Sequence, residues 1–201
     1  FESSYAIAPS VPPMLLILIP AILMSVSVVR EKELGSIINF YVTPTTRLDF
    51  LIGKQLPYVV IGMINFVVLT MLTVFIFGVP IKGSGLTLIG CALLYVIATT
   101  SLGMVISGFT SSQVAAVFVT AIVTMLPTTQ FSGMLQPVST LAGGARVVGS
   151  LWPTTYYMHA SVGAFTKGLG PRLLAFDALA LAAFIPVLTW IAVVSLRSQE
   201  T

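Results

Sequence analysis

Long apolar runs separated by short polar links organise this chain. A helix needs about 20 apolar residues to cross a hydrocarbon core about 30 Å thick. Five runs come close to that length or exceed it, and each predicts one membrane-spanning helix. They cover residues 12–29, 56–77, 86–109, 114 to 126 or 131, and 173–196.

One charged stretch, residues 30–54, interrupts this pattern between the first two runs. It holds seven of the chain's fifteen charged residues. Apolar side chains recur at helical spacing from Leu34 to Tyr41, with polar side chains between them. This spacing predicts a first amphipathic helix.

A second amphipathic helix is predicted after Pro44, which cannot continue the first one. Thr46 and Asp49 stand three positions apart, as in a capping box, so the helix should run from about Arg47 to Gln55. Charges at the centre of a bilayer cost about 2.5 to 3.5 kcal/mol each. Both helices should therefore lie at the membrane surface.

Composition supports the same class of protein. Hydrophobic residues make up 57% of the chain, charged residues 7%, and mean hydropathy is +1.05, whereas soluble domains are about 25% charged. The net charge of +3 comes from scattered groups, which argues against direct nucleic-acid binding. The lone Cys91 excludes an internal disulfide and a cysteine-based metal site.

Residues 127–170 differ from the spans because proline and glycine recur throughout them. No uninterrupted span fits there, yet the region is too apolar for a solvated loop. Broken helices at membrane depth are tolerated where protein covers them. We expect a pair of short re-entrant helices, with an interfacial helix between Leu141 and Trp152.

Five spans place residues 30–54, the link 110–113 and the C-terminus on one side of the membrane. Residues 1–10, 78–85 and 127–170 then face the other side. Four basic residues crowd the 30–54 stretch, so the positive-inside rule makes its side cytoplasmic and the other external.

Several motifs resemble the ABC-2 type transporter permeases, most closely the membrane portion of the ribosome-associated ATPase group of ABC transporters. They are REKELGSI from Arg30, VTP from Val42, LIGKQLPY from Leu51, FSGM from Phe131 and WPTTYY from Trp152. The resemblance implies an all-α membrane domain of six helices, of the type V exporter kind. This chain would be a single such domain, residues 1–201, without the first helix and most of the external loop that precedes residues 1–10.

The resemblance further implies a permease half of an ATP-driven exporter in the bacterial inner membrane. Its implied partners are an ABC nucleotide-binding domain, in the same or another polypeptide, a second permease half, lipid, and in some members a periplasmic adaptor. ATP and Mg²⁺ would bind the ATPase domain and no cofactor would bind this chain. Gly53 and Lys54 are not a P-loop, because Gln55 follows and Leu48 stands where glycine is required. We therefore expect no enzyme activity in this chain.

A secondary transporter or channel is the alternative function. Such a protein should carry buried charges for ion coupling, and only Asp177 qualifies. Internal repeats, which are typical of many secondary transporters, are not evident in the sequence.

The charged stretch is the candidate for transmitting force from an ATPase to the spans. The alternative is an ordinary solvated flank of a span. The residues proposed for coupling are Arg30, Glu31, Glu33, Gly35, Pro44, Arg47, Gly53 and Lys54.

Polar residues within the spans have two interpretations each. Asn65 could line a substrate path or hold two helices together. Thr128, Thr129 and Gln130 close the fourth run, where they could touch substrate or cap a broken helix.

Small residues recur every fourth position at Thr99, Gly103 and Ser107, which favours close helix packing within the fold or across a dimer. Asp177 lies about two turns into the last run. A place near the external interface is favoured over a proton relay. His159, the only histidine, has no acidic neighbour in sequence and is expected at the interface.

Overall fold

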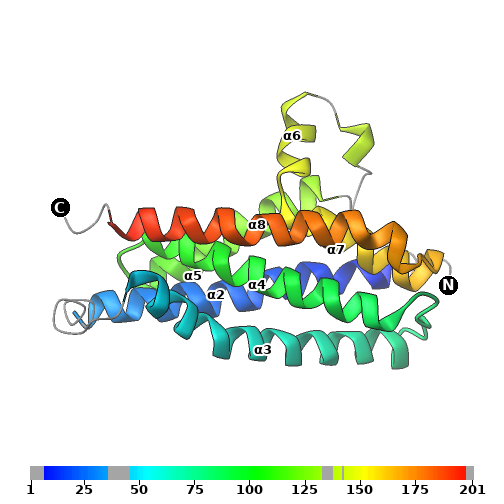
Figure 1. Ribbon diagram of the computed structural model, residues 1–201, viewed down its shortest axis with the longest axis horizontal. Helices are drawn as coiled ribbons and strands as arrows, with labels where there is room; N and C mark the ends of the chain where they lie inside the picture. The colour runs from blue at the N-terminus through cyan, green and yellow to red at the C-terminus, as the bar shows by residue number, and fades with distance from the viewer. Residues whose placement is uncertain (1–6, 36–45, 133–137, 142, 198–201) are drawn as a thin grey trace.

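The computed structural model describes residues 7–35, 46–132, 138–141 and 143–197, and every regular element in these ranges is helical. The chain's five long helices run alongside one another as a bundle (Figure 1). They are α2 (Val11–Glu33), α3 (Arg47–Phe75), α4 (Gly85–Phe109), α5 (Gln113–Phe131) and α8 (Pro171–Arg197). Each is long and apolar enough to cross a membrane. The expectation of an all-α protein with five spans is therefore confirmed for the described residues.

Helix α4 is the centre of the bundle. It packs against α2, α3 and α8, and 67% of its span is buried, against 22%, 22% and 17% for the spans of α3, α5 and α8. The outer helices expose large apolar side chains along much of their length. The span of α2 is 50% buried. This distribution suits a bundle surrounded by hydrocarbon, in which α4 and, to a lesser extent, α2 are shielded by protein.

The small residues of α4 lie on its buried faces. Thr99, Gly103 and Ser107 are all buried. A Cβ on Gly103 would lie 3.1 Å from Ala21 Cα in α2 and closer still to the Ala21 carbonyl oxygen. The close approach at Gly103 is therefore made between α2 and α4 inside this fold.

The charged stretch departs from its predicted form at both ends. Helix α2 continues to Glu33, and Gly35 follows with a φ of +69°, which interrupts helical geometry. The prediction of a helix running on through Leu34 and Gly35 is therefore wrong. Its remainder, and Pro44, lie outside the described residues.

Helix α3 begins as predicted but does not stop where expected. Thr46 Oγ1 accepts from the Asp49 amide at 3.2 Å, and Asp49 Oδ2 accepts from the Thr46 amide at 3.2 Å. The capping box is confirmed. However, α3 runs unbroken to Phe75 with Pro57 inside it, so the loss of one backbone hydrogen bond at the proline does not end the helix. The separate second helix is therefore wrong, and the charged residues of α3 belong to the same rod as the span.

The region 127–170 consists of short helices where it is described. Pro127 does not end α5, which reaches Phe131. Four short elements follow: the 3₁₀ turn η3 (Val138–Thr140), α6 (Gly144–Ser150), α7 (Pro153–Val162) and the π-helix η4 (Gly163–Lys167). Helix α6 stands away from the bundle (Figure 1). That these helices are re-entrant and external stays a prediction.

Candidate functional site

Three successive charged residues close α2, and each reaches a different helix. We call Glu31, Lys32 and Glu33 the α2 tip. Glu31 Oε1 lies 2.8 Å from Lys54 Nζ on α3. The two side chains are 32% and 15% exposed, respectively, so the pair is partly shielded from water. Lys54 Nζ also lies 5.3 Å from the centre of the Phe50 ring.

Lys32 is directed at the end of the central helix. Its Nζ donates to the carbonyl oxygen of Ser107 at 2.5 Å and to that of Thr110 at 3.5 Å. The last carbonyls of a helix lack intrahelical partners and carry partial negative charge. A lysine there stabilises the C-terminus of α4 and ties it to α2.

Glu33 binds the beginning of α5, so that an acidic side chain meets a helix N-terminus. Its carboxylate accepts from the Gln113 backbone amide at 2.9 Å and from Gln113 Nε2 at 2.5 Å. Gln113 is the first residue of α5, where amides are unpaired and the helix dipole is positive. The α2 tip thus connects the adjacent ends of α3, α4 and α5.

The other residues proposed for coupling are less engaged. Arg30 is exposed and lines a polar cavity of about 460 Å³ beside Glu31, Lys54 and Gln113. Gly53 faces open space on α3, and Arg47 begins that helix. Nothing in the sequence indicates the contact between Glu33 and Gln113, because the two residues lie 80 positions apart.

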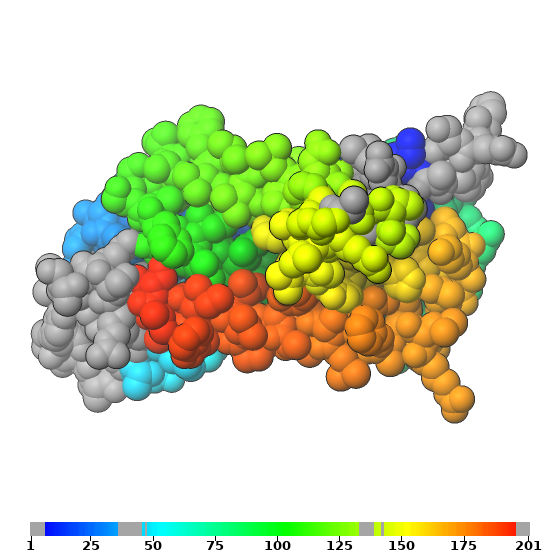
Figure 2. Space-filling model, turned by 90° about the horizontal axis from the view of Figure 1, so that it is seen from above, coloured from blue at the N-terminus to red at the C-terminus, as the bar shows by residue number. Residues whose placement is uncertain are grey.

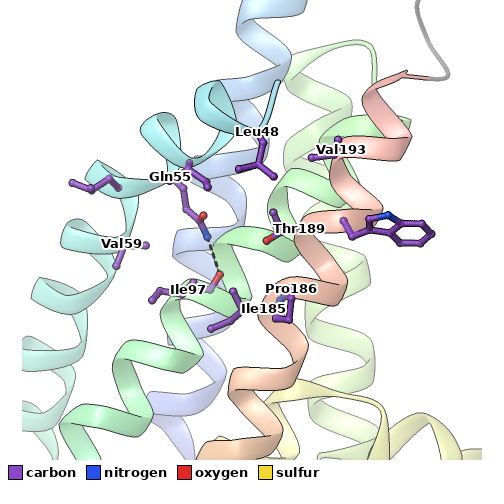
Figure 3. Close-up of a pocket in the computed structure, with 11 residues that line it drawn as sticks. Leu48, Gln55, Val59, Ile97, Ile185, Pro186, Thr189 and Val193 are labelled. Atoms are coloured by element: carbon purple, nitrogen blue, oxygen red, sulfur yellow. Dashed lines mark hydrogen bonds between the residues drawn. The ribbon is translucent and has the colours of Figure 1, made fainter. Parts of the chain in front are cut away.

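A second feature is an apolar groove between α3, α4 and α8 (Figure 3). Its volume is about 670 Å³. Gln55 lies on its α3 side and is only 7% exposed. Gln55 Nε2 donates to the Ile97 carbonyl at 3.0 Å, Thr100 Oγ1 at 2.8 Å and Ser101 Oγ at 3.0 Å, all on α4. The residues that line the groove are Leu48, Ile52, Gln55, Leu56, Val59, Ile97, Ile185, Pro186, Thr189, Trp190 and Val193.

Thr128 belongs to a buried hydroxyl cluster between helices. It accepts a hydrogen bond from Trp152 Nε1 at 3.0 Å, and its Oγ1 lies 3.3 Å from Thr154 Oγ1. Tyr95 OH lies 2.9 Å from the same Thr154 oxygen. These contacts connect α4, α5 and α7. The structure therefore gives Thr128 bonding partners, while its role in a substrate path stays a prediction.

The other three polar candidates, Asn65, Thr129 and Gln130, do not belong to this hydroxyl cluster. Thr129 Oγ1 donates to the Met125 carbonyl of its own helix at 2.9 Å, and Gln130 is exposed. Asn65 Nδ2 is buried and has no partner among the residues described. Neither interpretation of Asn65 is tested by these contacts.

The buried hydroxyls allow a matched stability test. Thr120 Oγ1 is fully buried without a partner in the described part of the chain, so Thr120→Val should leave stability unchanged or raise it. Thr154→Val removes a bonded hydroxyl and leaves Tyr95 with one partner fewer, which should cost about 1 to 3 kcal/mol. Thermal unfolding of both variants in detergent measures the difference. Equal losses of stability in the two variants would contradict the different hydrogen bonding of Thr120 and Thr154.

His159 and Asp177 form a pair that the sequence did not reveal. His159 Nδ1 lies 2.7 Å from Asp177 Oδ2, with the histidine side chain 53% exposed and the aspartate 7%. They join α7 to α8 near one end of the bundle. The sequence did not suggest this pair because His159 and Asp177 lie 18 positions apart. Within the described ranges no three His, Cys, Asp or Glu residues gather in a way that could hold a metal ion.

Comparison with known proteins gives a consistent set of relatives. The sequence model of ABC-2 family transporter proteins matches residues 2–194. The chain is 31% identical over 192 residues to the probable multidrug ABC transporter permease YbhS of Escherichia coli K12, covering 94% of this chain and 51% of that protein. No solved structure matches the chain.

Two further relatives are more distant. The probable multidrug ABC transporter permease YbhR of Escherichia coli K12 is 27% identical over 140 residues, which is 70% of this chain and 38% of YbhR. The inner membrane transport permease YhhJ of the same organism is 25% identical over 170 residues, 81% of this chain and 45% of YhhJ. The chain thus spans about half the length, or less, of the curated relatives it matches.

Proposed function

The chain belongs to the ABC-2 family of transporter permeases, and we propose that it forms the membrane-spanning half of an ATP-driven exporter. The observation that carries this proposal is the family match, which covers residues 2–194 and all five spans. It favours an ABC permease over a secondary transporter or channel. In this proposal the chain catalyses no reaction, and ATP and Mg²⁺ bind an ABC ATPase that acts on it.

The α2 tip is the proposed receiver of force from that ATPase. A motor outside the membrane can act on the spans only through a stiff element that contacts several of them. Glu31, Lys32 and Glu33 contact α3, α4 and α5, and α3 is continuous from Arg47 into its span. A displacement of this end would therefore act on four helices together.

The remaining partners follow from the same proposal. Two permease halves would form one transporter in the bacterial inner membrane, with residues 127–170 on the external side, where a periplasmic adaptor could bind. The YbhS and YbhR relatives are described as probable multidrug permeases. Efflux of apolar compounds is accordingly the transport we propose for this chain.

The direct test is purification of the complete polypeptide with its associated proteins from native membranes. We expect an ABC ATPase to co-purify, and ATP to drive transport of apolar dyes into inside-out vesicles. Transport driven by an ion gradient without ATP would refute the proposal in favour of a secondary transporter.

Orientation is tested by single cysteines in a Cys91→Ala background. Ser111, Lys82 and Ser139 are exposed, with Ser111 at the α2 tip end. With an impermeant thiol reagent on intact cells, Lys82→Cys and Ser139→Cys should be labelled, and Ser111→Cys only after permeabilisation. Labelling of Ser111→Cys in intact cells would reverse the orientation.

A further inference from the structure

The groove between α3, α4 and α8 is lined by a side-chain amide, that of Gln55, whose oxygen has unused bonding capacity. Gln55 lines the groove and is more than nine-tenths buried. The group facing the Ile97 carbonyl must be the nitrogen, because a carbonyl oxygen only accepts hydrogen bonds. This assignment leaves Gln55 Oε1 as the free end, and it accepts no hydrogen bond from any residue in the described ranges. An amide oxygen without a donor in apolar surroundings is unfavourable, so the groove favours an occupant that supplies one.

The size of the groove selects the kind of occupant. A volume of about 670 Å³ lies within the roughly 300 to 1,000 Å³ typical of small-molecule sites. Along α3 the lining runs from Leu48 to Val59, which is about 16 Å at 1.5 Å per residue. This is about half of a hydrocarbon core about 30 Å thick. A transmembrane helix would need a groove as long as the hydrocarbon core is thick.

The surroundings of the groove define its chemistry. Its walls are aliphatic apart from Gln55, Thr189 and Trp190, and Trp190 at the rim is 68% exposed. Figure 3 shows the Gln55 side chain directed from α3 toward α4, with Thr189 of α8 across the groove. An occupant that enters from the lipid with an apolar body therefore meets the Gln55 amide oxygen and, across the groove, the Thr189 hydroxyl.

We propose that this groove binds an uncharged amphipath from the bilayer, consisting of a hydrocarbon body and one hydroxyl or N–H group that donates to Gln55 Oε1. The inference deepens the proposed function, and it depends on that function only for the step from a bound molecule to a transported one. Binding itself needs no ATP. A failure to bind would therefore leave the exporter assignment standing, and a failure of ATP coupling would leave the binding site standing.

The test uses a long-chain alcohol that carries a photoreactive diazirine on its chain, and the methyl ether of the same alcohol as the matched probe without a donor. The complete polypeptide is reconstituted in phosphatidylcholine nanodiscs, and crosslinked residues are identified by mass spectrometry. We expect saturable labelling of Val59, Ile97 and Val193, with the ether bound about 2- to 12-fold more weakly because one hydrogen bond is lost.

Two substitutions at neighbouring positions separate the groove from ordinary lipid contact. Val59 lines the groove, whereas Val60 lies outside the lining and is 52% exposed. Val59→Phe should abolish saturable labelling, and Val60→Phe should preserve it. Gln55→Met should remove the preference for the alcohol over the ether. The valine pair and the two probes keep the test decisive if Gln55→Met does not fold.

Three results would overturn the proposal. Labelling that does not saturate, or that is equal in the two valine variants, means ordinary bilayer contact only. Saturable labelling without preference for the alcohol refutes recognition by Gln55. A groove that no probe labels in the complete polypeptide is occupied by another protein segment.

Discussion

Gly103→Ala should destabilise the bundle more than any other single methyl group added to α4. A Cβ at this position would meet the backbone of Ala21 in α2, with Cα at 3.1 Å and the carbonyl oxygen nearer. Backbone atoms cannot rotate away, so α2 and α4 must separate along their contact. Overpacking of this kind costs typically about 1 to 3 kcal/mol, and the contact lies in the most buried helix of the fold.

Two other glycines of α4 provide controls. Gly90 has nothing within 4 Å of the added Cβ, so Gly90→Ala should be neutral or stabilising, since alanine favours a helix by about 1 kcal/mol over glycine. A Cβ on Gly108 would meet the Ser195 side chain, whose hydroxyl can rotate but whose Cβ, at 2.7 Å, cannot. The stability lost in Gly108→Ala should therefore be intermediate. Folded yield and thermal unfolding in detergent rank the three variants. An equal effect of Gly90→Ala and Gly103→Ala would contradict the close packing of α2 and α4.

The sequence predicted those features that depend on local or one-dimensional chemistry. Spans follow from hydropathy because bilayer thickness sets their length, and Gly85–Phe109 matches its predicted bounds to within one residue. The Thr46 and Asp49 cap follows from a spacing of three. Helical spacing of Thr99, Gly103 and Ser107 predicted close packing, although it did not identify α2 as the neighbour.

What the sequence did not predict depends on contacts between distant segments. Glu33 and Gln113, or His159 and Asp177, have no shared pattern, because pairing across helices is set by the packed bundle. The helix end predicted near Gln55 is also wrong because a contact between distant segments decides it. The second amphipathic helix was expected to end at about Gln55, yet the side-chain amide of Gln55 is bonded to α4 and α3 continues past it.

The interactions of Glu33 also change how the coupling hypothesis should be tested. Its carboxylate already accepts two hydrogen bonds from Gln113. A charge reversal at Glu33 would break this internal contact whether or not an ATPase binds there. The Glu31 and Lys54 pair is a cleaner choice, because both charges belong to the chain and can be exchanged.

Exchanging these two charges should separate internal coupling from direct docking. Glu31→Lys places two cations together on α2 and α3, and Lys54→Glu places two anions together. Partly shielded pairs fall between exposed ones, about 0 to 1 kcal/mol, and buried ones, about 3 to 5 kcal/mol. A cost of about 1 to 3 kcal/mol corresponds to a 5- to 150-fold change. We expect each single variant to lose that much ATP-driven transport and the double variant to recover most of it.

Transport and ATP hydrolysis by the reconstituted complex are the measurements, with membrane insertion checked for each variant. Lys82→Glu, a charge reversal in an exposed residue of the turn after α3, serves as the control and should behave like the unsubstituted protein. Recovery in the double variant requires that the two charges act on each other, because an ATPase that recognised Glu31 directly would meet the wrong charge in the double variant too. A double variant as impaired as the singles would assign Glu31 or Lys54 to the ATPase contact. Unimpaired single variants would make this end of α2 an ordinary solvated flank.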